Sequence, residues 1–371
     1  MTLSVFLTAD LHLGMKFAGY PESAQAALVE ARFACLERMV EQAGSLGCDL
    51  FIVAGDLFDR ISAARRDIQR AATALRSFSG KLVAVLPGNH DYLGPGDQLW
   101  PAFRSSCGDS VLLLDEPRAY PLVRYDVDAC LYAGPCTSKH SRSNAIQWVK
   151  GAPKDPAVTH HLGVAHGSLE GFSPDFTESY YPLTTVELLS SGMSAWLIGH
   201  THVPFPAAPG PRDRIFNPGT PEPDGFDCLH TGSAWHLQFS AKDAVTATRV
   251  PTGSLRFIEE TIAVHGAADL ELLLRRYSGH DARSILLRAN LAGRVPHDLV
   301  SEIGRIRQSL TEGLLYSELR TTRLSEEITR EAIDREYPQG SFPHQLLSRL
   351  AASGDSEALS VAQDLLEETR G

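Results

Sequence analysis

The chain has 371 residues, 43% of them hydrophobic, and a formal net charge of −11, which is the composition of a globular protein large enough for two domains. This acidic balance argues against nucleic-acid binding through bulk positive charge, although bound metal ions or a basic partner would alter the local charge. No apolar run approaches the roughly 18 residues of a membrane span, and the N-terminus lacks a basic region and a cleavage site. We therefore expect a cytoplasmic protein without a membrane anchor, whose six scattered cysteines are reduced and mostly lie in the core.

The first predicted strand, residues 4–9, ends at Asp10 and His12, which stand one residue apart where the chain can bend. A helix with apolar residues at helical spacing is predicted over residues 23–46. A second continuous apolar strand follows at residues 50–54. This alternation predicts a sheet layered with helices.

The second strand ends at Gly55-Asp56, and a helix predicted over residues 63–78 leads to a third apolar strand at residues 81–86. That strand runs into Pro87-Gly88-Asn89-His90-Asp91, in which the Pro-Gly pair turns the backbone sharply. An amide oxygen, an imidazole and a carboxylate are thus presented together at a strand's carboxyl end, the edge of an open α/β sheet where ligands bind.

The pattern is looser after Asp91, where short strands at residues 110–114, 118–123 and 129–133 are predicted to form a meander. Two later apolar strands again end in histidine: residues 162–165 run into His166, and residues 195–198 run into Gly199-His200-Thr201-His202. We expect a first domain over residues 1–262, a small α+β domain over 263–325 and a helical tail over 326–371.

Five predicted strand ends therefore carry side chains that can bind metal ions, and each follows four or more apolar residues. These side chains are those of Asp10, His12, Asp56, Asn89, His90, His166, His200 and His202. A single histidine after a strand is usually a hydrogen-bonded turn residue, and Asp56 could simply cap the following helix. Five such coincidences at matching positions favour one site instead. A bridging carboxylate with imidazole and amide ligands suits two divalent ions about 3.5–4 Å apart.

The ordered motifs Asp-x-His, Gly-Asp-x-x-Asp, Gly-Asn-His-Asp, a strand-end histidine and Gly-His-x-His resemble those of the calcineurin-like metallophosphoesterases. The opening Thr-Ala-Asp-Leu-His-Leu-Gly and the motif Gly-Asp-Leu-Phe-Asp are most similar to the branch of bacterial DNA repair exonucleases of the SbcD, Mre11 and YhaO type. The resemblance implies a four-layer αββα sandwich with a small C-terminal α+β domain. It covers residues 4 to about 220.

Carried over by motif position, the resemblance implies one ion held by Asp10, His12, Asp56 and His202. It implies a second ion held by Asp56 as the bridging ligand together with Asn89, His166 and His200. His90 would face the scissile phosphate, and Asp91 would orient His90 as an outer carboxylate.

Two positions leave alternatives open. Some nucleases of the family carry a histidine where this chain has Asp59, so a phosphate contact there is in doubt. His160 and His161 compete with His166 for the late ligand position. We prefer His166 because an apolar strand leads directly to it and Gly167 follows.

The resemblance implies a phosphodiesterase that uses manganese, with iron(II) or magnesium as alternatives, and that acts on DNA. It also implies a homodimer and an SbcC- or Rad50-like ATPase partner, for which the C-terminal helices are a candidate docking surface. Hydrolysis of a small-molecule or cyclic-nucleotide phosphodiester is the competing function, which the acidic composition favours. A non-catalytic scaffold is poorly supported because every ligand position is intact.

The predicted small domain is rich in arginine, and such a stretch could face a phosphate backbone. The arginines are Arg275, Arg276, Arg283, Arg288, Arg294, Arg305, Arg307, Arg320 and Arg323. Glutamates and aspartates are interspersed with them, so a solvated face of mixed charge is the slightly favoured interpretation.

Overall fold

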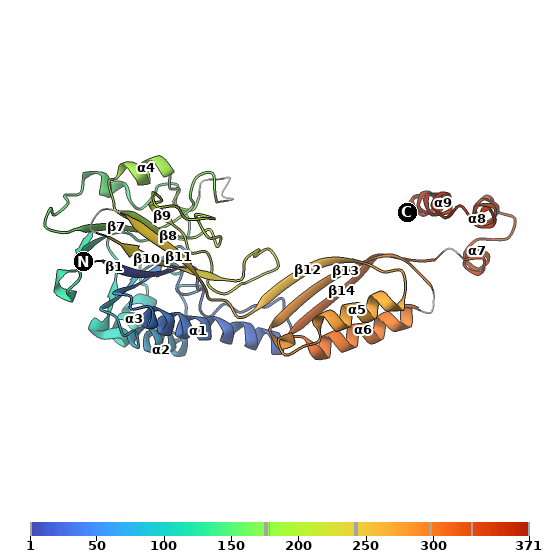
Figure 1. Ribbon diagram of the computed structural model, residues 1–371, viewed down its shortest axis with the longest axis horizontal. Coiled ribbons are helices and arrows are strands. Elements are labelled where there is room, and N and C mark those ends of the chain that lie inside the picture. The colour runs from blue at the N-terminus through green and yellow to red at the C-terminus, as the bar shows by residue number, and fades with distance from the viewer. Residues whose placement is uncertain are drawn as a thin grey trace. The chain divides into compact units, whose positions relative to one another are not determined.

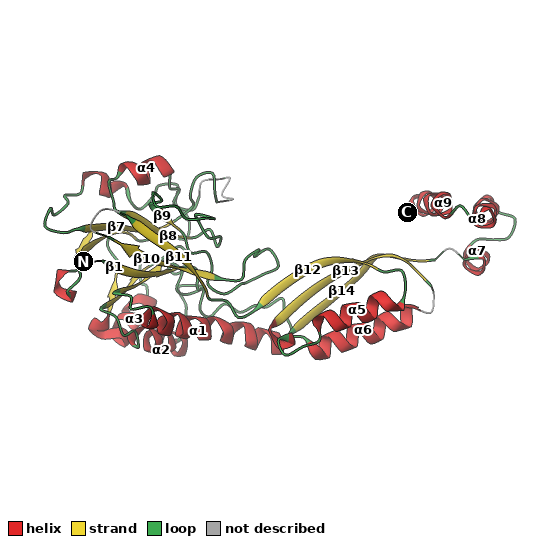
Figure 2. Ribbon diagram, in the orientation of Figure 1, coloured by secondary structure: helices red, strands yellow, loops and turns green. Residues whose placement is uncertain are grey.

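The structure is a computed structural model in which the contacts divide the chain into two compact units, Met1–Phe257 and Ile258–Gly371 (Figures 1 and 2). The boundary predicted from the sequence, after residue 262, lies near the end of strand β12 (Arg256–Ala263), which was not predicted. The described residues are 2–173, 177, 179–240, 244–296, 299–327 and 329–369.

The first unit contains a six-stranded sheet in the order β11-β10-β1-β2-β3-β4. Strands β1 to β4 run parallel to one another. Strand β10 pairs antiparallel with β1 on one side and with β11 on the other. The strands are β1 (Leu3–Thr8), β2 (Leu50–Ala54), β3 (Leu82–Leu86), β4 (Val111–Leu113), β10 (Ser233–Phe239) and β11 (Val245–Pro251).

A second sheet of five strands has the order β5-β6-β7-β8-β9, with β6 to β9 parallel and β5 antiparallel to β6. The predicted meander is wrong, because β4 pairs with β3 in the first sheet while β5 and β6 belong to the second. The strands are β5 (Ala119–Pro121), β6 (Ala129–Gly134), β7 (His160–His166), β8 (Ala195–Gly199) and β9 (Ile215–Phe216).

These sheets and their helices form four layers, which confirms the predicted sandwich (Figure 2). Helices α1 (Glu22–Ser45), α2 (Arg65–Arg76) and α3 (Leu99–Cys107) cover the outer face of the first sheet. The short helix α4 (Thr185–Ser190) packs on the outer face of the second. Because each sheet is buried on both faces, its central strands are continuous apolar runs.

Strand β2 shows how the sequence builds these layers. Phe51 and Val53 pack with helix residues such as Phe33, whereas the alternate residues Leu50 and Ile52 join the core between the two sheets. Successive side chains of a strand point to opposite faces, so five apolar residues in a row serve two cores at once. All five residues of β2 are buried.

In the second unit, helices α5 (Ala267–Tyr277) and α6 (Leu299–Gly313) share an apolar core with a three-stranded sheet. Its strands are β12 (Arg256–Ala263), β13 (Ile285–Val295) and β14 (Tyr316–Glu326). Three further helices, α7 (Arg330–Glu336), α8 (Phe342–Ser353) and α9 (Ser356–Glu368), build a small core of their own. Among the described residues, no helix is both long and apolar enough to cross a membrane.

Candidate metal centre

Side chains that can bind metal ions lie together where five parallel strands of the first unit end. The first sheet contributes residues that follow β1, β2 and β3, and the second sheet contributes the end of β7 and the turn after β8. The cluster consists of Asp10, His12, Asp56, Asn89, His166, His200 and His202, with His90 beside it. All the residues predicted as metal ligands are therefore in one place.

One group within the cluster joins Asp10, His12 and His202. The Nε2 atoms of His12 and His202 lie 3.0 Å apart, and Oδ1 of Asp10 lies 4.0 Å from Nε2 of His202. Both Asp10 carboxylate oxygens also accept a hydrogen bond from the His200 backbone N–H at 3.0 Å. Thus the turn after β8 is held directly against the end of β1.

A second group joins Asn89, His166 and His200. Oδ1 of Asn89 lies 3.0 Å from Nε2 of His166 and 3.1 Å from Nδ1 of His200. Nδ1 of His166 lies 2.9 Å from the carbonyl oxygen of Ala54, to which it donates a hydrogen bond in the tautomer that leaves Nε2 unprotonated. Its free lone pair then faces the interior of the cluster.

Asp56 stands between the two groups. Its Oδ2 lies 3.7 Å from Nε2 of His12 and 3.2 Å from Nε2 of His166, while Oδ1 accepts a hydrogen bond from the His90 N–H at 2.8 Å. Asp56 is 1% exposed, so its charge is removed from water. This is the position that a carboxylate shared by two ions would occupy.

The backbone at these ligands is strained. Asp10, His12, Asp56, His200 and His202 all have positive φ, at 54°, 45°, 51°, 109° and 59°. Each such residue costs about 1–3 kcal/mol and persists only where surrounding contacts impose it. Such outliers gather at functional sites, and here they turn consecutive side chains into one small volume.

Burial sets the electrostatics of the cluster. It raises the pKa of Asp10 above its usual range, against the opposing effect of the nearby His202 and His166. It lowers the pKa of His12 well below the ordinary value. Burial also acts to lower the pKa of His166, but the Asp56 carboxylate outweighs it and the pKa rises to about 9. Two buried acids therefore lie among several imidazoles, and a multivalent cation would neutralise the negative charge of the two carboxylates.

The donor set fits divalent metal ions. Two imidazole Nε2 atoms face each other at 3.0 Å next to two carboxylates, an arrangement that a shared cation between them would stabilise. In addition, Nδ1 of His12 is buried and has no hydrogen-bond partner among the residues that the structure describes. A set of ligands that combines carboxylate and amide oxygens with imidazoles suits Mn²⁺ and Fe²⁺ better than it suits an ion that prefers oxygen ligands alone.

His90 and Asp91 do not relate to each other as predicted. The Asp91 carboxylate accepts hydrogen bonds from the N–H groups of Phe58 at 2.9 Å and Gly88 at 2.7 Å, so it braces two loops. Nδ1 of His90 lies instead 3.1 Å from the carbonyl oxygen of Asp59. The expected orientation of His90 by the Asp91 side chain is therefore corrected, because a nearer backbone acceptor takes that role.

The competing histidines lie elsewhere. His160 and His161 begin β7, whereas His166 ends it, so they lie at the opposite edge of the second sheet. Nδ1 of His161 lies 3.0 Å from the hydroxyl of Tyr132. Neither residue joins the described cluster.

Sequence reasoning missed a charged network behind His202. Asp224 contacts the His202 ring at 3.0 Å, and the buried Arg32 of α1 contacts Asp224 at 3.5 Å. Neither residue follows an apolar strand, which was the signal used to find the ligands. The acidic Pro-Glu-Pro-Asp-Gly turn soon after the last histidine motif was the available hint.

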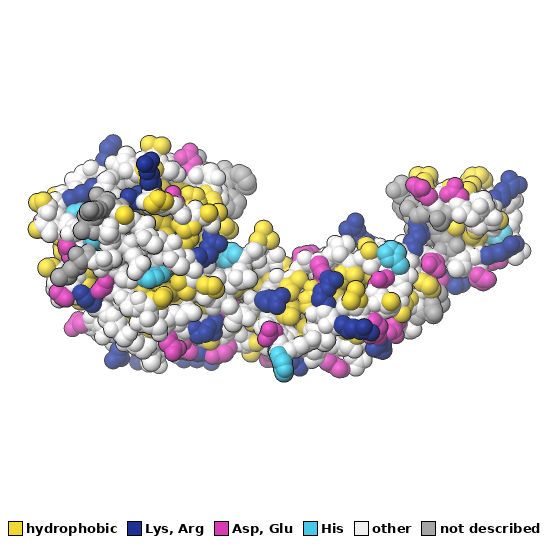
Figure 3. All heavy atoms as spheres, in the orientation of Figure 1, with side chains coloured by type: hydrophobic (Ala, Val, Ile, Leu, Met, Phe, Trp, Pro, Cys, Tyr) yellow, Lys and Arg dark blue, Asp and Glu magenta, His cyan; other side chains and the backbone are white. Residues whose placement is uncertain are grey.

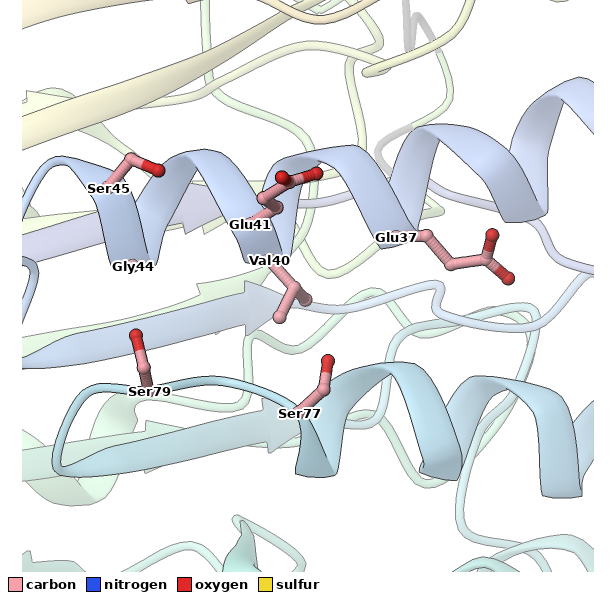
Figure 4. Close-up of a pocket in the computed structure, with 7 residues that line it drawn as sticks. All are labelled: Glu37, Val40, Glu41, Gly44, Ser45, Ser77 and Ser79. Atoms are coloured by element: carbon pink, nitrogen blue, oxygen red, sulfur yellow. The ribbon is translucent and has the colours of Figure 1, made fainter.

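A hollow of about 560 Å³ between the last turns of α1 and α2 is separate from this cluster (Figure 4). Glu41 and Ser45 of α1 border it, and so do Ser77 and Ser79 from the connection before β3. The connection that follows α2 leads to the amino end of β3. The hollow therefore lies away from the carboxyl ends that carry the metal-type side chains.

Adding Mn²⁺ to metal-stripped protein should raise the melting temperature, because ions that bind only the folded state stabilise it. At a hundredfold excess over the dissociation constant the gain is about 2.7 kcal/mol per site. Thermal unfolding in EDTA and in Mn²⁺ measures the shift. His12→Ala should reduce it and His161→Ala should leave it intact, so an equal shift in all three proteins would contradict a site at the cluster.

Two comparisons with known proteins agree with this geometry. The sequence profile of the calcineurin-like phosphoesterases matches residues 3–204, which is more than half of the chain and includes every ligand position. The chain is also 29% identical over 215 residues to a Bacillus subtilis protein named "Uncharacterized metallophosphoesterase YhaO". That alignment covers 54% of this chain and 48% of the relative, so the chain matches about half of the relative's length.

Proposed function

Because this chain belongs to the calcineurin-like phosphoesterase family, we propose that it is a dinuclear metal-dependent DNA nuclease of the SbcD/Mre11 type that acts in DNA repair. The observation that carries the phosphodiesterase assignment is the buried cluster of two carboxylates, an amide and four imidazoles at five strand ends. The preferred ions are Mn²⁺, with Fe²⁺ or Mg²⁺ as alternatives.

The ligand roles follow from the two groups and the shared carboxylate. Asp10, His12 and His202 would hold one ion, Asn89, His166 and His200 the other, and Asp56 both. When bound, the ions would supply positive charge at the phosphate and a water of lowered pKa.

His90 would act on the substrate itself. Its ring lies edge-on to that of His12, with ring centres 4.7 Å apart, and the residue is partly exposed. With Nδ1–H directed at the carbonyl oxygen of Asp59, Nε2 is left for the phosphate or the leaving oxygen. A protonated His90 would donate a hydrogen bond or a proton there as the bond to the leaving group breaks.

A groove lined in part by the residues that follow His12 in sequence supports a polymeric phosphodiester as substrate. The groove has a volume of about 700 Å³ and is lined by the residues that follow His12, by the first part of α1 and by the start of α2. Lys16, Arg60 and Arg66 line it and would contact phosphates there, although Arg60 pairs with Asp59 and Arg66 with Asp67. Acids line it as well, so its positive charge is local rather than continuous.

A small-molecule phosphodiesterase is the second candidate, and the charge distribution favours it. Several arginines of Ile258–Gly371 pair with glutamates: Arg276 with Glu260 at 2.7 Å and Arg320 with Glu318 at 2.6 Å. Figure 3 shows basic and acidic side chains interspersed on the visible face of this unit. This arrangement favours the solvated mixed-charge face over a continuous DNA-binding surface.

We further propose that the nuclease forms a homodimer and works with an SbcC- or Rad50-like ATPase in the cytoplasm. The helices α7 to α9 are the proposed docking surface, because Phe342, Val361 and Leu365 are more than half exposed on them. The cytoplasmic location is supported by the cysteines, all six of which are free, five of them buried.

The substrate class is tested by offering Mn²⁺-loaded protein both end-labelled linear duplex DNA and bis-p-nitrophenyl phosphate. We expect degradation of DNA, and we expect His90→Ala to lose that activity because the group facing the phosphate is gone. His161→Ala is the matched control, since it removes a histidine at the other end of the sheet. Hydrolysis of the small substrate alone would favour the second candidate.

A further inference from the structure

The segment between β9 and β10 wraps around His202. Oδ2 of Asp224 lies 3.0 Å from Nδ1 of the His202 ring, which leaves Nε2 to face His12 and Asp10. A histidine that binds a metal through one nitrogen usually gives the other N–H to a carboxylate, which fixes the tautomer and the ring plane. Asp224 occupies that outer position.

Arg32 of α1 forms an ion pair with Asp224 in turn. The guanidinium is 2% exposed, lies 3.5 Å from Oδ2 of Asp224 and donates a hydrogen bond to the carbonyl oxygen of Leu11 at 2.5 Å. Leu11 stands between Asp10 and His12. The Arg32 side chain therefore contacts both the carboxylate behind His202 and the loop that carries the other two ligands. A buried arginine without its counter-charge would be costly, which explains why the two occur together.

The same segment also fixes the backbone of these ligands. Nε2 of His230 lies 2.6 Å from the carbonyl oxygen of His202, and the N–H of Thr220 donates to the same oxygen at 3.2 Å. The hydroxyl of Thr220 donates to the carbonyl oxygen of Asp10 at 3.1 Å. Residues 220–230 thereby contact the backbone carbonyl groups of Asp10 and His202, both of which have positive φ.

The other ligand group has a different support. Nδ1 of His166 contacts the carbonyl oxygen of Ala54, at the end of β2, and Asn89 contacts His166 and His200 directly. The contacts of Asp224 with His202 and Arg32 fall on the first group, Asp10, His12 and His202. The His200 N–H and the loop after β2 connect the two groups, but Asp224 contacts a ligand side chain of the first group only.

We propose that Asp224, anchored by Arg32, is a positioning residue that sets the affinity of the Asp10–His12–His202 metal position without setting that of the Asn89–His166–His200 position. This inference rests on the proposed dinuclear function. A loop outside the metal-ligand motifs would then control how tightly one of the two ions binds.

Calorimetric titration of metal-stripped full-length protein with MnCl₂ tests this inference. We expect Asp224→Ala to weaken one of two binding events by roughly 10–100-fold and to leave the other unchanged. Asp224→Asn keeps an oxygen that accepts the His202 N–H and should lose less. Asp227→Ala is the matched control, because it removes an exposed aspartate from the same segment and should bind both ions as the wild type does.

The outcomes separate the two proposals. Equal weakening of both ions, or wild-type affinity for both in Asp224→Ala, would overturn the positioning role. A purely structural role would lower the melting temperature of the metal-free protein without selecting one ion. If the wild type bound two ions yet hydrolysed neither DNA nor bis-p-nitrophenyl phosphate, the proposed function would fail and the assignment of Asp224 would stand. Wild-type protein that bound no Mn²⁺ would overturn both.

Discussion

Replacing Asp56 by asparagine should reduce phosphodiester hydrolysis by more than the roughly 100-fold that losing an outer partner of a metal ligand costs. Oδ2 of Asp56 lies within 3.7 Å of ligand nitrogens from both groups, so one substitution removes a charge that both ions share. The initial rate on bis-p-nitrophenyl phosphate at saturating Mn²⁺ measures the loss. Circular dichroism should show an unchanged fold, because asparagine has nearly the same shape.

Asp126→Asn provides the control for Asp56→Asn. The Asp126 side chain is 97% exposed and pairs with Lys81, one residue before β3 begins, so it lies at the other end of the sheet. Its substitution should leave the rate within experimental error. Wild-type activity in Asp56→Asn would show that the cluster does not perform the hydrolysis.

Replacing Gly55 by alanine should destabilise the protein by about 2–5 kcal/mol, combining the cost of a left-handed residue with that of an overpacked core. Gly55 has φ +97°, and an added Cβ would lie 2.0 Å from Nδ1 of His166. Urea denaturation of the metal-free protein measures the free energy of unfolding. The same substitution should weaken Mn²⁺ binding, because His166 has to move.

Gly47→Ala separates the two contributions. Gly47 is also left-handed, with φ +66°, but an added Cβ there has no heavy atom within 4 Å. It should therefore cost only about 1–2 kcal/mol, the conformational part. Equal losses in the two variants would mean that His166 moves aside without penalty and that its position is not tightly held.

The ligand positions could be predicted because they obey one rule. A buried parallel strand must be apolar along its whole length, so the first polar residue after it marks the carboxyl end, and the carboxyl ends of neighbouring strands meet. Asp56 after β2 and His166 at the end of β7 illustrate this rule in the two sheets. The rule places the ligands at one edge of each sheet, whereas the meeting of the two edges depends on how the sheets pack.

The outer network could not be found in this way. Arg32 lies within a long amphipathic helix, where charged residues are common and one of them does not stand out. Asp224 lies in an irregular segment. The contact between Arg32 and Asp224 joins residues 192 positions apart in sequence (224 − 32), so it depends on tertiary packing. The left-handed ligands were equally hidden, because only a small minority of aspartates and histidines adopt positive φ and nothing in the local sequence marks which ones do.

The errors in the fold have a related cause. Strands β4 and β5 have three residues each, too short for an alternating pattern, so nothing in the sequence assigned them to different sheets. Strand β12 is made of exposed and partly buried residues and carries charged side chains such as Glu259 and Glu260, so no strand was predicted there. Short or half-exposed strands give the weakest pattern.

Strand β1 has a partner on each side, and the two become available at very different times during synthesis. Its parallel partner β2 ends at residue 54, but its antiparallel partner β10 is complete only at residue 239. While the ribosome makes the intervening chain, one edge of β1 has no strand to pair with, and an open edge invites other chains. Strand β10, which finally pairs with this edge, follows directly after residues 220–230, the segment that contacts His202. The nascent protein therefore completes its first sheet and the support of its metal site in nearly the same interval.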